Sequence, residues 1–406
     1  MKAYERFLNY IAIPTASDEK SMATPSTACQ FDLSRFLAKE MTEMGLTDVS
    51  VDEHAYVYGF IPATPGYEKS KRIGLIAHLD TVDGFEAKPV NYQIIEHYDG
   101  KDIPLGTSGK VLTVKQFPHL AERVGKTIIT TDGTTVLGAD DKAGIAAILT
   151  ACETLLKSDA PHGKVCICFT PDEEIGHGAS LLDLDRFGAD LAYTVDGGGP
   201  EGMEFETFNA AAAKWEITGV SVHPGSAKDT MVNAVLVAME INAMLPEGQT
   251  PRDTQDREGF FHLCDISGDV TKATMEYIIR DHDRELFAQR KAKMQEIEEK
   301  INRKYGEGTA KLTLVEQYRN MAEIVCQYPE LLEKARKAIS DVGLEPVSVP
   351  VRGGTDGAQL SFRGLPCPNL GAGGYSFHGP YEHLVVEELD QSVEILLNII
   401  REFAEN

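Results

Sequence analysis

Acidic and histidine side chains follow short apolar segments at five places in this sequence, and these are the residues whose types and spacing could do chemistry. His78 and Asp80 are two positions apart, so they would share one face of an extended segment. A carboxylate commonly supports a metal-bound imidazole, although a buried His-Asp pair can also serve stability alone. Asp140 and Asp141 begin a helical pattern, where acids either favour the helix start or bridge two cations.

The remaining three places leave the same choice between a structural and a chemical role. Asp172, Glu173 and Glu174 follow an apolar strand pattern. On a loop, water would screen their repulsion; in a cleft, a cation would offset it, and one glutamate could be a ligand and another a proton carrier. Asp196 precedes three glycines and could form a simple Asp-Gly turn. His378 lies in a Gly- and Pro-rich loop, where a surface histidine is the alternative.

Taken together, these segments favour a metal centre. Ligands of open parallel sheets bind beyond the carboxyl ends of the strands, so side chains that end several strands can meet. Two imidazoles and several carboxylates, without a thiolate, suit zinc or a similar divalent ion. Two ions about 3.5–4 Å apart could hold a water and polarise a carbonyl. Cys166 and Cys168 alternate in an apolar run and are expected to be packed thiols of one strand face.

The composition excludes several classes of function. The chain has 406 residues and a formal net charge of -24, which argues against nucleic-acid binding. No apolar run approaches 18 residues and the N-terminus is charged, so neither a membrane span nor a signal peptide is expected. The seven scattered cysteines are typical of reduced thiols. We therefore expect a cytoplasmic protein.

Strand and helix patterns alternate through the first two hundred residues, which predicts an α/β fold with a mixed, mostly parallel sheet flanked by helices. In this part the patterns predict strands over 72–79, 164–170 and 191–195, helices over 33–44 and 145–156, and hairpins and loops over 85–135. Farther along they predict strands over 211–222, 273–280 and 311–315 and helices over 232–239, 285–305 and 330–342. We therefore predict a discontinuous catalytic domain, 1–208 and 321–406, with an inserted α+β domain, 209–320.

Longer motifs make the sequence similar to the family of co-catalytic di-zinc peptidases and aminoacylases. The matching segments are HLD at 78–80, TTDG at 130–133, LGADDKAGI at 137–145, FTPDEE at 169–174, YTVDGGG at 193–199, VHPG at 222–225, YIIRD at 277–281 and RGGTDGAQLS at 352–361. The likeness covers essentially the whole chain, and the GADDKAG and RGGTDGA blocks are the specific ones. Ser376 departs from the asparagine expected there.

The resemblance implies a set of metal ligands. Asp140 would bridge two zinc ions. His78 and Asp196 would complete the protein ligands of one ion, and Glu174 and His378 those of the other. Cobalt or manganese could substitute for zinc.

The same resemblance implies the catalytic roles. Asp80 would orient His78, and Glu173 would be the general base that moves a proton from water to the leaving amine. The peptide between the two adjacent aspartates would be cis. The inserted domain would form a lid and dimer interface. From it, His223 would reach the active site across the dimer to stabilise an oxyanion, unless it is only a strand-end residue of the dimer contact.

Three further residues are implied as substrate contacts. Asn233 would help to bind the same group as His223, or would cap a helix. Arg280 and Arg352 would hold a peptide carboxylate, or would form structural ion pairs. The implied activity is that of a homodimeric aminopeptidase that removes the N-terminal residue from tripeptides. A dipeptidase, a carboxypeptidase or an N-acyl amino acid hydrolase could use the same centre, and a non-catalytic peptide-binding protein could share the fold.

Overall fold

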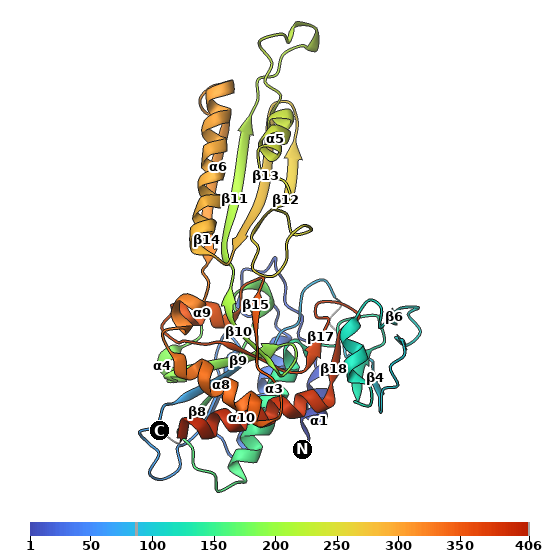
Figure 1. The fold of residues 1–406 in the computed structure, drawn as a ribbon, viewed down its shortest axis with the longest axis vertical. Helices are drawn as coiled ribbons and strands as arrows, with labels where there is room; N and C mark the ends of the chain where they lie inside the picture. The colour runs from blue at the N-terminus through green and yellow to red at the C-terminus, as the bar shows by residue number, and fades with distance from the viewer. Residues whose placement is uncertain (86–87, 405–406) are drawn as a thin grey trace. The chain divides into compact units, whose positions relative to one another are not determined.

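The computed structural model describes residues 1–85 and 88–404, so residues 86–87 of the predicted loop region 85–135 lie outside the described part. The chain forms two compact units (Figure 1). The first unit comprises 1–205, 321–349 and 355–406, and the second comprises 206–320 and 350–354. The predicted boundaries had assigned 206–208 and 350–354 to the catalytic domain. The segment 350–354 groups with the second unit because Arg352 donates hydrogen bonds to the carbonyls of Asp256 and Glu258.

An eight-stranded mixed sheet forms the centre of the first unit, in the order β1-β2-β8-β3-β9-β16-β10-β15. The pairs β8-β3, β3-β9 and β9-β16 are parallel, whereas β1-β2, β2-β8 and β16-β10 are antiparallel. The strands are β1 Thr47–Val51, β2 Val57–Ile61, β3 Ile73–His78, β8 Val165–Thr170, β9 Leu191–Gly197, β10 Gly202–Thr207, β15 Val347–Val351 and β16 Asn369–Gly371. The predicted α/β class is therefore confirmed.

Helices cover both faces of this sheet because side chains alternate between two apolar cores. Ile167 and Phe169 of β8 face the larger core, while Cys166 and Cys168 face the smaller one, as their alternation predicted. The helices of the first unit are α1 Ala3–Ile11, α2 Gln30–Met44, α3 Ala139–Leu156, α4 Leu184–Phe187, α7 Ala322–Val325, α8 Pro329–Asp341, α9 Asp356–Phe362 and α10 Val386–Ala404. In the part of the chain that the structure describes, no helix has the length and apolarity that crossing a bilayer requires.

The turn-rich region, for which hairpins and loops were predicted, contributes strands to a small antiparallel sheet. Its order is β17-β18-β7-β4, with β4 Tyr92–Ile95, β7 Ile128–Thr131, β17 Gly374–Tyr375 and β18 His383–Val385. Beside it are β5 Ile103–Pro104, β6 Val111–Leu112 and the 3₁₀ turn η1 Pro118–Arg123. The loop between β17 and β18 carries His378, so this sheet fixes both ends of a candidate ligand loop.

The second unit is an antiparallel sheet in the order β12-β13-β11-β14, with two helices packed on one face. The elements are β11 Asn209–Thr218, α5 Ala234–Ala243, β12 Phe260–Gly268, β13 Lys272–Asp281, α6 Arg284–Tyr305 and β14 Ala310–Tyr318. The structure of this unit differs from the sequence analysis at two strands. The first strand ends at Thr218 rather than at residue 222, because Val220 forms only an isolated bridge with Val232. Strand β12 was not predicted.

Candidate metal centre

Three adjacent strands of the first unit supply three of the five predicted ligands. His78 is the last residue of β3, Asp196 lies near the end of β9, and Glu174 lies in the 3₁₀ turn Glu173–Ile175 that follows β8. Because β8, β3 and β9 are neighbours and parallel, their carboxyl ends meet at one edge of the sheet.

The other two predicted ligands come from irregular backbone. Asp140 lies at the start of α3, after Gly138 in the left-handed conformation (φ 80°), and the Asp140–Asp141 peptide is cis, as the resemblance implied. His378 lies in the loop between β17 and β18, with φ 60°. Ser376 in this loop has φ 58°, a conformation that asparagine adopts more readily than serine.

The five side chains come together around the carboxylate of Asp140. One oxygen of Asp140 lies 2.7 Å from Nε2 of His78, and the other lies 3.1 Å from Nε2 of His378. The carboxylate of Asp196 is 3.6 Å from Nε2 of His78, and that of Glu174 is 2.9 Å from Nε2 of His378. Each imidazole therefore has a carboxylate of its own and shares Asp140 with the other.

Two sets of ligand atoms in this cluster lie within 4.8 Å of one another. The sets are His78, Asp140 and Glu174, and His78, Asp141 and Asp196. Asp141 differs from the others because its carboxylate already accepts backbone N–H groups, from His78 at 3.1 Å and from Gly144 at 3.2 Å. Its contacts are those of a side chain that fixes the backbone.

The electrostatics of the cluster favour a cation. Burial, and then the charge of Asp140, raise the pKa of Asp196 well above its ordinary value. Burial also raises the pKa of Glu174. Burial also acts to raise the pKa of Asp140, but hydrogen bonds with His378 and His78 outweigh it and lower that pKa. Carboxylates crowded in this way repel one another unless positive charge lies among them, and imidazole nitrogens with carboxylate oxygens form a donor set that suits zinc. The residues present therefore fit a divalent metal.

The three successive acids after β8 have different surroundings. Asp172, in the left-handed conformation (φ 57°), accepts hydrogen bonds from the backbone N–H and hydroxyl of Ser26 and from the amide of Gln30. Glu174 faces His378, as described above. The half-buried carboxylate of Glu173 has no hydrogen-bond partner among the described residues. Glu173 is therefore the one acid of the three that is free to exchange a proton.

Asp80 supports both sides of the cluster. Its carboxylate is fully buried and accepts the backbone N–H groups of Glu173 at 3.0 Å and Glu174 at 3.2 Å. It also lies 3.3 Å from Nδ1 of His78, but the backbone carbonyl of Asp80 is closer to that nitrogen, at 3.0 Å. The carboxylate therefore holds the segment of Glu173 and Glu174, here called the glutamate loop, at least as firmly as it holds the imidazole of His78.

His223 and Asn233 belong to the second unit. Nδ1 of the exposed His223 accepts the backbone N–H of Gly225 at 3.1 Å, so the neutral ring carries its proton on Nε2. Asn233 is the N-cap of α5, where its side-chain oxygen accepts the N–H groups of Val235 and Leu236. The capping alternative for Asn233 is thus realised, and its amide nitrogen is left for another partner.

The two predicted arginines also lie in the second unit and have partners within it. Arg352 donates to the hydroxyl of Thr254 and to two backbone carbonyls, and its guanidinium lies 5.1 Å from the ring centre of Phe208. Arg280 donates to two backbone carbonyls and lies over the ring of Tyr318. Their substrate-binding roles stay predictions.

The structure also reveals buried acids that the motifs did not assign. Glu382 is 1% exposed and accepts the backbone N–H groups of Leu137, Gly138 and Asp140. Asp356 is 3% exposed, accepts the hydroxyl of Thr170 at 2.9 Å, and has its pKa raised by burial to about 6. The signal for Asp356 was its place in the RGGTDGA block. The only signal for Glu382 was its position four residues after His378.

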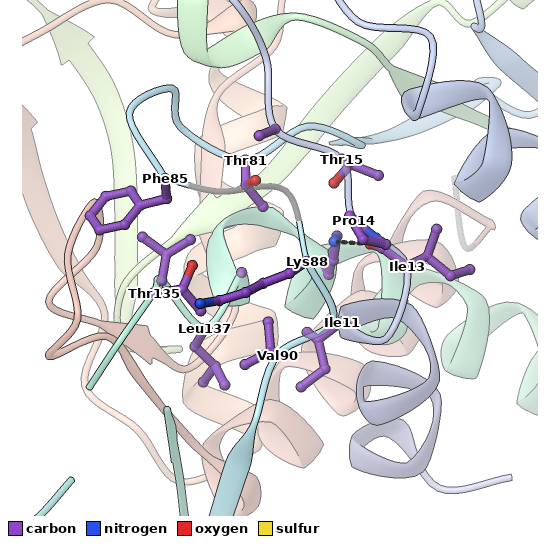
Figure 2. A pocket seen from close by; sticks show the side chains of 14 residues that line it. Ile11, Ile13, Pro14, Thr15, Thr81, Phe85, Lys88, Val90, Thr135 and Leu137 are labelled. Carbon is purple, nitrogen blue, oxygen red and sulfur yellow. Dashed lines mark hydrogen bonds between the residues drawn. The ribbon is translucent and has the colours of Figure 1, made fainter. Parts of the chain in front are cut away.

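A small, partly open cavity of the first unit is drawn in Figure 2. Its volume is about 20 Å³, which is too small for a peptide. Lys142 lines it and donates to the carbonyl of Ile13 at 2.8 Å, and burial lowers the pKa of this lysine to about 8. None of the five predicted ligands lines this cavity.

Comparison with known proteins identifies the family. The pattern of Peptidase family M20/M25/M40 matches residues 131–402. Peptidase T from Clostridium perfringens (strain 13 / Type A) is 49% identical over 405 residues, which is 100% of this chain and 99% of that protein. This chain is a member of peptidase family M20/M25/M40. The resemblance on the motifs of the sequence is thereby confirmed.

Solved structures of peptidases share the fold along the whole chain. Aminopeptidase PepT from Bacillus cereus ATCC 10987 superposes with a TM-score of 0.79 at 24% identity, covering 99% of this chain and 98% of its own. A dinuclear metal-binding M20 peptidase from Bacillus subtilis superposes with a TM-score of 0.67 at 15% identity, covering 100% of this chain and 98% of its own. This chain is thus an M20 peptidase with a candidate metal-ligand cluster at the sheet edge.

Proposed function

We propose that this chain is a di-zinc aminopeptidase that releases the N-terminal residue of tripeptides. The observation that carries the proposal is the carboxylate of Asp140, whose two oxygens each face one imidazole at 2.7 and 3.1 Å. A carboxylate in this position can bridge two ions. The identity of 49% to Peptidase T over the whole chain supports the choice of substrate.

The proposed mechanism assigns the cluster to metal binding and Glu173 to proton transfer. His78 and Asp196 would hold one zinc ion, Glu174 and His378 the other, and Asp140 both. Such a pair of ions would polarise the scissile carbonyl and make a nearby water more acidic. Glu173, whose carboxylate has no hydrogen-bond partner among the described residues, would take the proton from that water and give it to the leaving amine.

His223 would stabilise the developing oxyanion in the active site of a partner subunit. The N–H of Gly225 occupies Nδ1, so the proton on Nε2 of the neutral ring is available for donation. Asn233, Arg280 and Arg352 would contact the substrate through the donors that their present partners leave free.

The chain would act as a homodimer in the cytoplasm. Helix α5 is apolar almost throughout, and its Leu236 and Met239 are each 60% exposed. An apolar helix surface of this kind in the second unit is suited to a contact between two copies of the chain.

Substrate assays and one substitution test the proposal. A tripeptide with a free amino terminus should be hydrolysed at least tenfold faster than its dipeptide, its longer analogue and its N-acetylated form. Equal hydrolysis of the N-acetylated form would reject the aminopeptidase and favour an N-acyl amino acid hydrolase.

Substitution of the proposed general base separates proton transfer from metal binding. Glu173→Ala should abolish turnover while the zinc content stays near two ions per chain by elemental analysis. Near-normal turnover of Glu173→Ala would reject Glu173 as the general base. A wild-type chain that binds no divalent metal would reject the proposed di-zinc centre.

A further inference from the structure

Glu382 is a buried carboxylate whose contacts all point to the turn that leads into α3. Its Oε2 accepts the backbone N–H of Leu137 at 2.6 Å and that of Gly138 at 2.9 Å. Its Oε1 accepts the backbone N–H of Asp140 at 3.0 Å. Glu382 lies 242 residues beyond Asp140 in the sequence, so this contact joins distant segments.

The turn needs an acceptor from elsewhere in the chain. The first N–H groups of a helix have no partner within the helix, and a side chain at the N-cap usually supplies one. Here the N-cap is Gly138, which has no side chain. Asp140 and Asp141 have non-helical backbone angles, so regular helix geometry does not fix them either. Glu382 supplies the acceptor for three backbone N–H groups of this segment, those of Leu137, Gly138 and Asp140.

The same loop region supplies one of the imidazoles. His378 precedes Glu382 by four residues, and its Nε2 lies 3.1 Å from Asp140. The segment 378–382 therefore contacts Asp140 twice, through an imidazole at the carboxylate and through a carboxylate at the backbone. Displacement of Glu382 would move the Asp140 carboxylate relative to both imidazoles.

From these contacts we infer that Glu382 is a positioning residue, which holds the Asp140 backbone so that each carboxylate oxygen faces one histidine. This inference rests on the proposed di-metal function of the cluster. A group that only stabilised the fold would not affect metal binding in this way: loss of Glu382 should weaken both metal sites together.

The test is a zinc titration of the metal-free protein in competition with a chromophoric chelator. In Glu382→Gln one acceptor oxygen becomes an NH₂ donor, which faces either Asp140 or the pair Leu137 and Gly138. We expect zinc affinity to fall about 10- to 100-fold for both ions. We expect kcat on a tripeptide to fall by a similar factor while KM changes less than about twofold.

Two control variants make the result specific. Glu40 accepts hydrogen bonds from Arg6 and Tyr10 at 2.8 and 2.7 Å, so Glu40→Gln removes a comparable structural acceptor that contacts none of the ligands. It should leave both zinc affinities unchanged. Asp196→Asn should weaken one ion only.

The remaining outcomes also decide the question. If Glu382→Gln retains both zinc affinities and kcat, or loses only the thermal stability of the metal-free protein, the inference is wrong. If Glu382→Gln does not fold, Glu382→Asp, which keeps the charge and shortens the reach, must show the same joint loss of affinity. A wild type that binds two zinc ions but hydrolyses no tripeptide would reject the proposed substrate and leave the inference standing.

Discussion

Replacement of Asp80 by asparagine tests how the glutamate loop and the imidazole share one carboxylate. One oxygen of Asp80 accepts the N–H of Glu173 at 3.0 Å and lies 3.3 Å from Nδ1 of His78, and the other accepts the N–H of Glu174 at 3.2 Å. In Asp80→Asn one of these oxygens becomes an NH₂ donor. The orientation that costs least keeps the oxygen toward Glu173 and His78 and turns the NH₂ toward the N–H of Glu174.

The free-energy cost of Asp80→Asn follows from the one backbone N–H, that of Glu174, which loses its acceptor. A buried N–H that loses its acceptor costs about 1–3 kcal/mol, which corresponds to about 5- to 150-fold if the whole cost appears in the transition state. The His78 ring should keep its tautomer, because its Nδ1 still donates to the backbone carbonyl of Asp80 at 3.0 Å. We therefore expect kcat to fall by about 10- to 100-fold with two metal ions still bound.

The assay is steady-state hydrolysis of a tripeptide together with elemental analysis of the purified variant. Glu40→Gln serves as the control for loss of a structural acceptor outside the cluster. A kcat for Asp80→Asn within twofold of wild type would show that the carboxylate does not hold the glutamate loop. Loss of one metal ion at unchanged kcat per loaded site would instead show that its main role is to orient His78.

Two further predictions concern stability. Burial, and then the charges of His119 and Arg123, lower the pKa of His383 to about 4, so between about pH 6.5 and 4 the unfolded chain binds the proton more readily and stability should fall as pH falls, by at most about 3 kcal/mol. The loss in urea midpoint from pH 7 to pH 5 should be smaller in His383→Gln, and an equal loss would contradict this assignment. A Cβ at Gly144 would lie 1.9 Å from the carbonyl oxygen of Val195, whereas one at Gly353 would meet nothing within 4 Å. Gly144→Ala should therefore lose about 1–3 kcal/mol in denaturant unfolding, while Gly353→Ala stays near wild type, and equal stabilities would refute the packing argument.

The central sheet could be predicted because its strands are short, apolar and buried on both faces. β3, β8 and β9 are buried at almost every position, so the sequence shows them as continuous apolar runs. β12 could not be recognised in this way, because most of its residues are exposed and its register shifts between Leu263 and Asp265. The helix α10 has a clear amphipathic period and was within reach of the same reasoning.

The candidate ligands could be predicted from strand ends, but the partners of the supporting acids could not. A sequence shows that Asp172 and Glu382 are acidic and follow informative residues. It does not show that Asp172 faces Ser26 and Gln30, or that Glu382 accepts the backbone N–H of Asp140. Those contacts join segments more than a hundred residues apart, and they depend on backbone N–H groups that every residue except proline carries.

The backbone contacts nevertheless divide the acids around the centre into two classes with different chemistry. Carboxylates of the first class accept at least one backbone N–H: Asp80, Asp141, Asp172 and Glu382. Carboxylates of the second class accept none from the described residues: Asp140, Glu173, Glu174 and Asp196. Hydrogen bonds from the backbone neutralise part of a buried charge and fix the side chain, so the first class is suited to holding geometry. The second class keeps its lone pairs for imidazoles, cations or a proton, and it coincides with the residues proposed as metal ligands and general base. If this division has a functional basis, substitution by the amide should remove a metal ligand in the second class, Glu173 excepted. In the first class it should lower kcat by disturbing the geometry, and for Glu382 it should also weaken binding of both ions.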